Sequence, residues 1–327
     1  MSTPTTDLTA HLDPARKHDF VFLFDVRDGN PNGDPDAGGA PRTDPETGQG
    51  IVTDVAVKRK IRNMVALLGE KKPGYDIYVE AGVALNAQHK RAYAELDLTP
   101  GQAGAEDKAR DWMCEAFFDV RMFGAVMSTG TAQESAAAED GESEPTSKSK
   151  GKGKKAKTTR VRYSCGRVQG PVQLTFSRSV DVVLPLENGI TRVTQTREED
   201  VANGESTEIG TKHTIPYGLY RGHGYFSAPL ARRTGVTHDD LDMFWRAFTL
   251  AFEHDRAATR GEMTLRGLYV FTHDDAFGRV PAGRLFDLLR IDRAQKDGPV
   301  TRSFNDYTVQ IDAEAVPAGV TLTTLLG

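Results

Sequence analysis

The chain has 327 residues, of which 38% are hydrophobic and 27% charged, and its formal net charge is −5. This composition is typical of a globular protein with a large core, organised as one elaborated domain or two. The sequence has no apolar run of membrane-spanning length, no signal-peptide stretch and too few cysteines for a structural zinc site. We therefore expect a cytoplasmic protein with no membrane partner and no cofactor. The negative net charge argues against unspecific nucleic-acid binding, but not against basic residues gathered on one track.

The N-terminal part of the sequence predicts an arm, a strand, a loop and a helix. Residues 1–18 are polar and predict a flexible arm, whereas residues 20–26 are apolar, aromatic and β-branched, as in a strand. A loop rich in Asn, Gly, Asp and Pro follows. Thr53 and Asp54 then open a helix, as its N-cap and as an acidic residue at the positive end of the helix dipole. The apolar stripe of this helix comprises Val57, Ile61, Met64, Val65 and Leu68.

The middle of the sequence changes character twice. Residues 75–96 contain pieces that look extended, and residues 106–120 have the apolar periodicity of a helix. Residues 128–160 have almost no large apolar side chain and run from acidic to lysine-rich. Such a segment buries too little apolar surface to offset its ordering entropy, so we predict a disordered insertion. Its lysines could touch target DNA, although a solvated loop is the simpler interpretation.

The second half predicts strands, a hairpin and a helix. Residues 172–177 alternate between apolar and polar, as in a strand with one buried face. Residues 187–214 are polar, with a turn signal at Asn203–Gly204, and predict a long projecting hairpin. Thr237 caps a helix, and we expect a strand over 263–272, a short helix over 282–290 and a last strand over 307–311. Two rounds of strand, helix and strand predict an α+β fold around an antiparallel sheet.

The loop after the first strand raises the question of a metal site. Asp28 to Gly33 fit the first half of a calcium loop, but the twelfth position is Gly39 instead of a bidentate Glu, so we reject that site. The glycines could instead bring backbone amides close to a phosphate or a neighbouring subunit, or form an ordinary turn. Clustered aspartates could hold Mg²⁺ for phosphodiester cleavage, or act only as turn formers: Asp25, Asp28, Asp34, Asp36 and Asp44.

Two basic groups could contact nucleic acid. Lys58, Arg59 and Arg62 project away from the apolar stripe and either bind phosphates irrespective of base or form a solvated helix face. The second group interleaves cations with aromatic rings that could stack on bases or belong to the sheet core: Lys212, His213, Tyr217, Tyr220, Arg221 and His223. Arg121 and Arg167 are weaker candidates, since each could pair with a carboxylate at the edge of the core. We interpret His254, Asp255, Arg256 and Arg260 as structural.

Several motifs, in order, resemble one family. NGDPD followed by PRTDPETGQGIVTDVAVKRKIRN, then RMFG, QGPVQLTFSRSV and KHTIPYGLYRGHGYFSAPLARRTGVTHDDLDMFWRAF, resemble the backbone subunit of CRISPR Cascade complexes, the seventh Cas family, in its type I-C branch. The similarity runs from Asp19 to about Leu289, and the segment after Leu289 has no assigned role. The resemblance implies a ferredoxin-like, RNA-recognition-type core with finger-like insertions. On this view residues 19–327 form a single elaborated domain, and the 187–214 hairpin is its thumb.

The resemblance also implies a function, a site and partners. It implies a non-catalytic subunit that polymerises along CRISPR RNA and presents it for pairing with target DNA in antiviral defence. The implied partners are that RNA, the target DNA strand, further copies of the chain, and the guide-processing, large and small subunits. The alternative is a metal-dependent target-RNA endoribonuclease that uses the loop aspartates. The expected RNA-binding residues are Asn32, Gly33, Lys58, Arg59, Arg62, Arg121, Arg167, Lys212, His213, Tyr217, Tyr220, Arg221 and His223.

Overall fold

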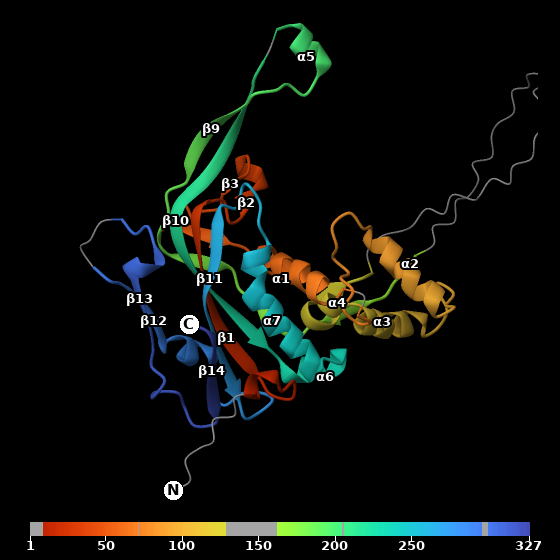
Figure 1. Ribbon diagram of the computed structural model, residues 1–327. Coiled ribbons are helices and arrows are strands. Elements are labelled where there is room, and N and C mark those ends of the chain that lie inside the picture. Colours follow the sequence, from red (N-terminus) through yellow and green to blue (C-terminus); the bar gives the residue numbers. More distant parts are fainter. Residues whose placement is uncertain (1–8, 71, 129–161, 205, 296–299) are drawn as a thin grey trace, which may run out of the picture.

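A computed structural model describes residues 9–70, 72–128, 162–204, 206–295 and 300–327 (Figure 1). Most of the predicted 128–160 insertion and residues 1–8 of the predicted arm lie outside the described residues. Helices lie against a central sheet, a small helical lobe extends to one side, and a hairpin projects from the body (Figure 1). Within the described ranges, no helix combines the length and the apolar character needed to cross a membrane.

The central sheet is antiparallel and has β1 in its middle. Its strand order is β14–β11–β1–β10–β8–β4, and β7 and β9 also pair with β10. β1 and β10 pair along almost the whole length of β1, from His18↔Phe226 to Gly29↔Ile215, and form the centre of the sheet. The strands are β1 (His18–Gly29), β4 (Gln49–Val52), β7 (Val172–Leu174), β8 (Ser177–Val182), β9 (Leu186–Arg192), β10 (Glu208–Phe226), β11 (Glu262–His273) and β14 (Val320–Leu326).

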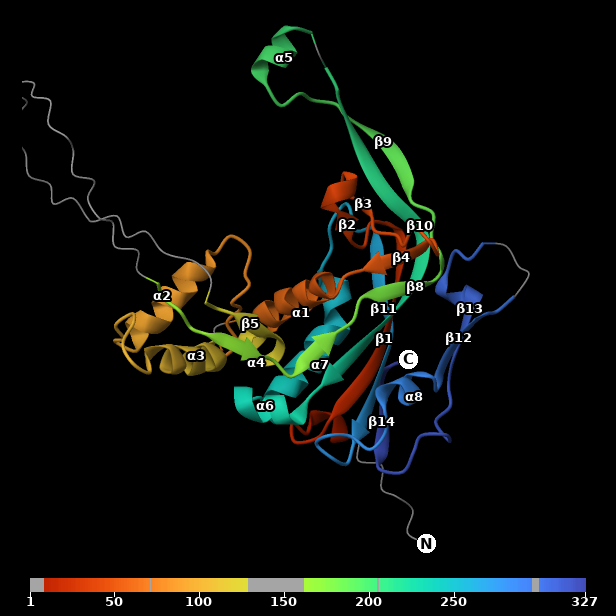
Figure 2. The same ribbon diagram turned by 180° about the vertical axis from the view of Figure 1, so that it is seen from behind.

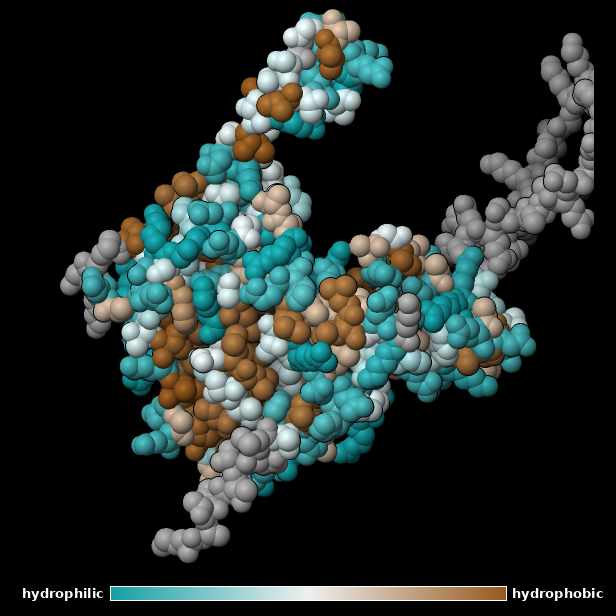
Figure 3. All heavy atoms as spheres, viewed as in Figure 1, coloured by the Kyte–Doolittle hydropathy of each residue, from teal (hydrophilic) through white to brown (hydrophobic). Residues whose placement is uncertain are grey.

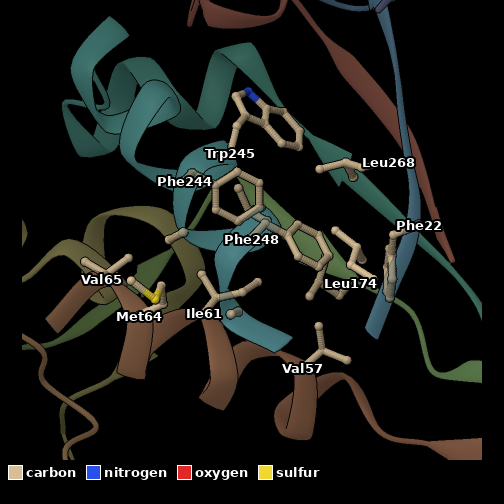
Figure 4. Packing of buried hydrophobic residues seen from close by; sticks show 14 of the residues in the cluster. Phe22, Val57, Ile61, Met64, Val65, Leu174, Phe244, Trp245, Phe248 and Leu268 are labelled. Atoms are coloured by element: carbon tan, nitrogen blue, oxygen red, sulfur yellow. The ribbon is translucent and has the colours of Figure 1, made fainter. Parts of the chain in front are cut away.

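Two helices cover one face of this sheet, as their periodicity predicts. α1 (Asp54–Leu68) and α7 (His238–His254) lie side by side over it. Phe22 of β1 packs against Phe248 of α7, with Val57 and Ile61 of α1 in the same fully buried cluster (Figure 4). The α7 N-terminus is closed by the Thr237 capping box, which confirms the predicted cap. The short helix α6 (Ala228–Thr234) precedes α7.

The opposite face of the sheet is covered by the C-terminal segment, whose role the sequence left unassigned. Val21 and Leu23 of β1 share a buried cluster with Leu285, Phe286 and Leu289. Leu285, Phe286 and Leu289 belong to a layer on the side of the sheet away from α1 and α7 (Figure 2). This layer consists of α8 (Ala282–Phe286), β12 (Leu289–Arg293), η3 (Phe304–Asp306) and β13 (Tyr307–Ile311). The predicted strand 307–311 is confirmed, but it is not the last one, because β14 follows and pairs with β11.

The helical lobe (residues 75–127 and 163–170) has its own core, in which Tyr78, Tyr93 and Phe117 are buried. The prediction of extended structure over 75–96 is wrong, because most of its second half forms a helix. The predicted helix 106–120 is real but is interrupted at Phe117. The lobe contains α2 (Leu85–Glu95), α3 (Ala105–Ala116), α4 (Phe118–Phe123), β5 (Gly124–Val126) and β6 (Arg167–Gln169).

The hairpin is formed by β9 and the first seven residues of β10, paired from Leu186↔Thr214 to Arg192↔Glu208. Its far end contains the short helix α5 (Glu198–Ala202), and the turn at Asn203–Gly204 ends that helix and does not join two strands directly. β10 continues from the hairpin into the sheet, so a single strand connects the two. Two further short strands, β2 (Gly33–Asp34) and β3 (Ala40–Pro41), and η2 (Pro35–Ala37) lie in the loop after β1.

The described part of the N-terminal arm, residues 9–18, is structured, which differs from the prediction for this range. Ala10 is buried in the 3-10 turn η1 (Ala10–Leu12), and the indole N–H of Trp245 donates a 3.0 Å hydrogen bond to the carbonyl of His11. His18 is fully buried and hydrogen-bonded on both ring nitrogens, to the Thr272 hydroxyl and the Asp13 carbonyl. The polar appearance of this segment therefore conceals a docked turn.

His18 makes the fold sensitive to acid. Burial lowers the pKa of His18 from its ordinary 6.5 to about 4. Its contribution to stability is therefore complete above about pH 6.5 and is lost as the pH falls from there toward 4, because only the unfolded chain takes up the proton. Between pH 7 and pH 5 this histidine should cost roughly 2 kcal/mol of unfolding free energy. Urea titrations at the two pH values measure this loss, and His18→Asn should show a smaller loss; an equal one would contradict the assignment.

Candidate functional site

Three of the predicted RNA-binding residues lie around one pocket of about 420 Å³, between the loop after β1, the start of α1 and the end of α7. Asn32 and Gly33 line it from the loop, and Arg59 lines it from α1. Arg260 lines the other side, from the segment that leads into β11. The pocket thus brings together loop backbone, an amide side chain and two guanidinium groups.

The loop is held in place by close backbone contacts. The Asn30 N–H donates to the carbonyl of Thr259 at 2.8 Å, and the Asn30 side-chain amide donates to the carbonyl of Gly39 at 2.7 Å. A Cβ on Gly33 would lie 2.8 Å from the same Gly39 carbonyl, so only glycine permits this approach of the two loop strands. The pocket therefore has a fixed wall.

Asn32 also fixes the start of α1. Its Oδ1 accepts hydrogen bonds from the backbone N–H and the hydroxyl of Thr53, both at 2.9 Å. Thr53 is the N-cap residue of α1, as predicted, but its hydroxyl donates to Asn32 and accepts no backbone N–H of the helix. Asn32 thereby joins the loop to the helix that carries Arg59.

The three cations predicted on α1 do not form one solvated face. Lys58 pairs with Asp54 at 3.0 Å and Arg62 pairs with Asp119 at 2.7 Å, and each of these two cationic side chains is only 11% exposed. Arg59 is exposed, and its Nε bonds only the amide oxygen of Asn63. Among the three, Arg59 therefore retains a charge directed to solvent, and the expectation that Lys58 and Arg62 project freely is corrected.

Lys60 was missed as a member of the site because it lies on the buried side of α1. Asp255 accepts hydrogen bonds from Lys60 and, at 2.6 Å, from Arg260. Burial lowers the pKa of Lys60, and the Asp255 carboxylate opposes that shift. The structural interpretation of Asp255 and Arg260 agrees with this bridge. Arg260 also reaches the pocket edge, where its side chain is one-third exposed.

Of the loop aspartates, Asp25, Asp34 and Asp44 engage separate partners. Asp34 pairs with Arg42 at 3.3 Å, and Arg178 holds the pKa of Asp44 below its ordinary value. Asp25 lies apart, in the sheet, where it accepts a hydrogen bond from the Tyr217 hydroxyl and forms an ion pair with Arg266 at 2.9 Å. The described residues contain no group of three or more His, Cys, Asp or Glu side chains with metal-site geometry.

The second predicted group is largely part of the core. Tyr217 and Tyr220 are 5% and 0% exposed, on opposite faces of β10. Arg221 donates to the carbonyls of Phe286 and Leu289, and the His223 ring stacks on the Phe286 ring at 4.3 Å. Burial lowers the pKa of His223 to about 4, which keeps its ring neutral. Tyr217 and Tyr220 therefore belong to the sheet core, Tyr217 under the C-terminal layer and Tyr220 on the face toward α1 and α7. Arg221 and His223 are half-buried beside the C-terminal layer and line a pocket of about 650 Å³.

Lys212 and His213 differ from the rest of that group. Both lie in the hairpin, opposite Asn188 and Glu187 respectively, and both are half-buried. They are therefore near the base of the projecting hairpin, where a ligand in contact with the body would also meet the hairpin.

Arg121 and Arg167 lie in very different surroundings. Arg121 is 8% exposed and makes a two-point contact with Asp240, at 2.7 and 3.0 Å. Its remaining donors reach the carbonyls of Gly74, Cys114 and Glu115, so the carboxylate-pairing alternative describes it. Arg167 is exposed on β6, distant in sequence and in fold from the loop pocket.

The family is decided by sequence comparison. Residues 16–312 match the model of the family described as CRISPR-associated protein Cas7. The chain belongs to the Cas7 family. A curated relative described as CRISPR-associated protein Cas7, from Haloferax volcanii, is 29% identical over 243 residues, which are 71% of this chain. The chain spans 64% of the length of that relative.

Solved structures give a more distant likeness to this Cas7-family chain. A chain of a CRISPR RNA-guided surveillance complex in a pre-nicking state shares 17% identity, with a TM-score of 0.43 over 78% of this chain and 75% of that one. A second CRISPR RNA-guided surveillance complex gives 14% identity and a TM-score of 0.40, over 78% of this chain and 68% of that one.

Proposed function

We propose that this Cas7-family chain is a non-catalytic, cytoplasmic subunit that binds CRISPR RNA in the backbone of a type I-C Cascade surveillance complex. Copies would stack head to tail along the RNA and present it to a target DNA strand in antiviral defence. The guide-processing, large and small subunits would complete the assembly. The observation that carries this proposal is the pocket that gathers Asn32, Gly33, Arg59 and Arg260.

The chemistry of this pocket suits a phosphodiester backbone. Guanidinium groups bind phosphate oxygens through paired N–H donors, and they do so without regard to base. A subunit that accepts any guide sequence needs this kind of contact, because specificity then belongs to base pairing. Lys58 and Arg62 lie on the same helix as Arg59 and are secondary candidates, since RNA would have to compete with Asp54 and Asp119 for them.

The proposed core is ferredoxin-like. Its units would be β1, α1, β7 with β8, β10, α7 and β11, and the sheet order β11–β1–β10–β8 supports this reading. We further propose that residues 19–327 form a single domain, that the helical lobe is its finger-like insertion and that the hairpin is its thumb. Lys212 and His213 would then lie where the thumb covers the guide.

Absence of catalysis is part of the proposal. The pairing of Asp34 with Arg42 and of Asp44 with Arg178 supports it, because a carboxylate engaged by arginine is a weaker Mg²⁺ ligand. The endoribonuclease alternative predicts divalent-dependent cleavage of a target RNA that disappears in Asp34→Ala/Asp36→Ala while RNA binding persists.

The test is RNA binding by Arg59→Glu, measured by fluorescence anisotropy at several salt concentrations. Removing one phosphate contact should weaken binding by about tenfold and reduce the slope of log K against log salt by about 0.7, the value for a single strand. Arg246→Glu is the matched control: it makes the same charge change on the exposed face of α7, away from the pocket. Equal affinities and slopes for both variants would contradict the proposed site.

A further inference from the structure

Four arginines line a cleft that the proposed RNA site does not use. The cleft has a volume of about 670 Å³ and lies between α3, β6 and α6. Arg110 comes from α3, Arg167 from β6, and Arg232 and Arg233 from the last turn of α6. Three elements from distant parts of the sequence therefore direct guanidinium groups into one cleft.

Most of this positive charge is uncompensated. Arg110 pairs with Asp107 and Asp111, whereas Arg167, Arg232 and Arg233 are exposed and have no ion pair with any described residue. The cleft is lined by four arginines and only two carboxylates, those of Asp111 and Glu115, in a chain whose net charge is −5. Cations at a helix C-terminus are favourable in themselves, which accounts for two of these arginines but not for Arg167.

The far end of the hairpin has the opposite character. The first turn of α5 presents Glu198, Glu199 and Asp200, beside a single arginine, Arg197. Val193 and Val201 are 86% and 59% exposed, and hydrophobic patches are visible along the projecting hairpin (Figure 3). Because the end of the hairpin carries carboxylates and exposed valines, it repels RNA phosphates and favours binding to a cationic protein surface with an apolar centre.

The two surfaces cannot meet within one copy. α5 lies at the top of the molecule, beyond the paired part of the hairpin, while α3 and α6 lie in its lower half (Figures 1 and 2). We propose that the acidic hairpin end (residues 193–202) of one copy docks in the arginine cleft of the next. The occupant of the cleft is thus a second copy of this chain. The inference rests on the proposed function only in assuming that copies stack head to tail.

The contact would join complementary groups. Arginine and carboxylate form two parallel hydrogen bonds, and Val201 would meet Leu230, the partly exposed apolar side chain in the cleft lining. Because the donor and acceptor surfaces differ, the contact is heterologous and leaves a free cleft and a free hairpin end on every pair. Such a contact continues into a filament and does not stop at a dimer.

Charge-reversal variants test the docking by sedimentation velocity without RNA. The hairpin variant Glu198→Lys/Glu199→Lys and the cleft variant Arg232→Glu/Arg233→Glu should each lower self-association at least tenfold. Mixed together they should recover self-association with the two variants alternating, because the intact hairpin end and cleft pair at one junction and the charge-reversed hairpin end and cleft pair at the next. All four substitutions in one chain should restore self-association. Arg246→Glu/Arg284→Glu, which reverses two exposed charges away from both surfaces, should leave it unchanged.

Three results would overturn this inference. One is a wild-type chain that stays monomeric at its highest attainable concentration, and another is failure of the four-fold variant to recover while circular dichroism shows it folded. The third is loss of RNA affinity in the cleft variant but not in the hairpin variant, which would make the cleft a nucleic-acid surface. RNA binding by the two charge-reversal variants is measured in parallel. If they still bind RNA but the four-fold variant does not recover self-association, the proposed docking is wrong and the proposed RNA-binding function stands. The comparison of Arg59→Glu with its control tests that function separately.

Discussion

Replacing Arg121 with methionine is expected to lower the free energy of unfolding by about 3–5 kcal/mol. The variant leaves Asp240 buried, 3% exposed at its side chain, without the cation that now compensates it. It also strips donors from the carbonyls of Gly74, Cys114 and Glu115, which join the turn at Gly74 and the end of α3 to α4. Because Asp240 accepts hydrogen bonds from Thr237 in the α7 capping box, the start of α7 is strained at the same time.

Urea unfolding followed by circular dichroism measures this loss. Arg110→Met, which removes a partly exposed ion pair from neighbouring α3, is the control and should cost less than about 1 kcal/mol. Adding Asp240→Asn to Arg121→Met removes the buried charge and should recover part of the stability. A loss below 1 kcal/mol for Arg121→Met would mean that water reaches Asp240, and the buried-pair account would fail.

The sequence predicted the elements whose burial follows a clear period. β1 and α7 have long apolar patterns, of the strand type and of the helix type, and both lie where they were expected. α2 was missed because only His89, Ala92 and Tyr93 of its eleven residues are buried, so it has almost no apolar period. β14 was missed because its threonines carry little hydrophobic signal at the edge of the sheet.

The candidate site was predictable only in part, because charge alone does not reveal a long-range partner. Lys58, Arg59 and Arg62 look alike in the sequence, yet Arg62 is neutralised by Asp119, 57 residues away, and Arg59 is not. Likewise, the interleaved cations and aromatics of β10 resemble a stacking surface until the C-terminal layer covers one side of it. Arg260 reaches the pocket only because the loop after β1 packs on residues 257–261.

Gly224→Ala is the second change with a large expected effect, on the order of 3 kcal/mol of destabilisation. Gly224 lies directly opposite Phe20 in the β1–β10 register, and a Cβ there would come closer than 3 Å to three carbons of the Phe20 ring. That ring cannot move aside, because it is fully buried and packed edge-on against the rings of Trp245 and Phe248. The absence of a side chain at Gly224 is therefore what lets the ring lie across β10.

The matched control is Gly189→Ala, a strand glycine of the hairpin with no atom within 4 Å of the added Cβ, which should change stability by less than about 0.5 kcal/mol. In the Gly224→Ala background, Phe20→Leu should cost less than it does alone, because the smaller side chain makes room for the new methyl group. Denaturant unfolding of the four chains in this cycle gives the coupling, expected at 1 kcal/mol or more in favour of the double variant. Additive losses would show that the strand backbone shifts instead, and that Phe20 is not what requires glycine at this position.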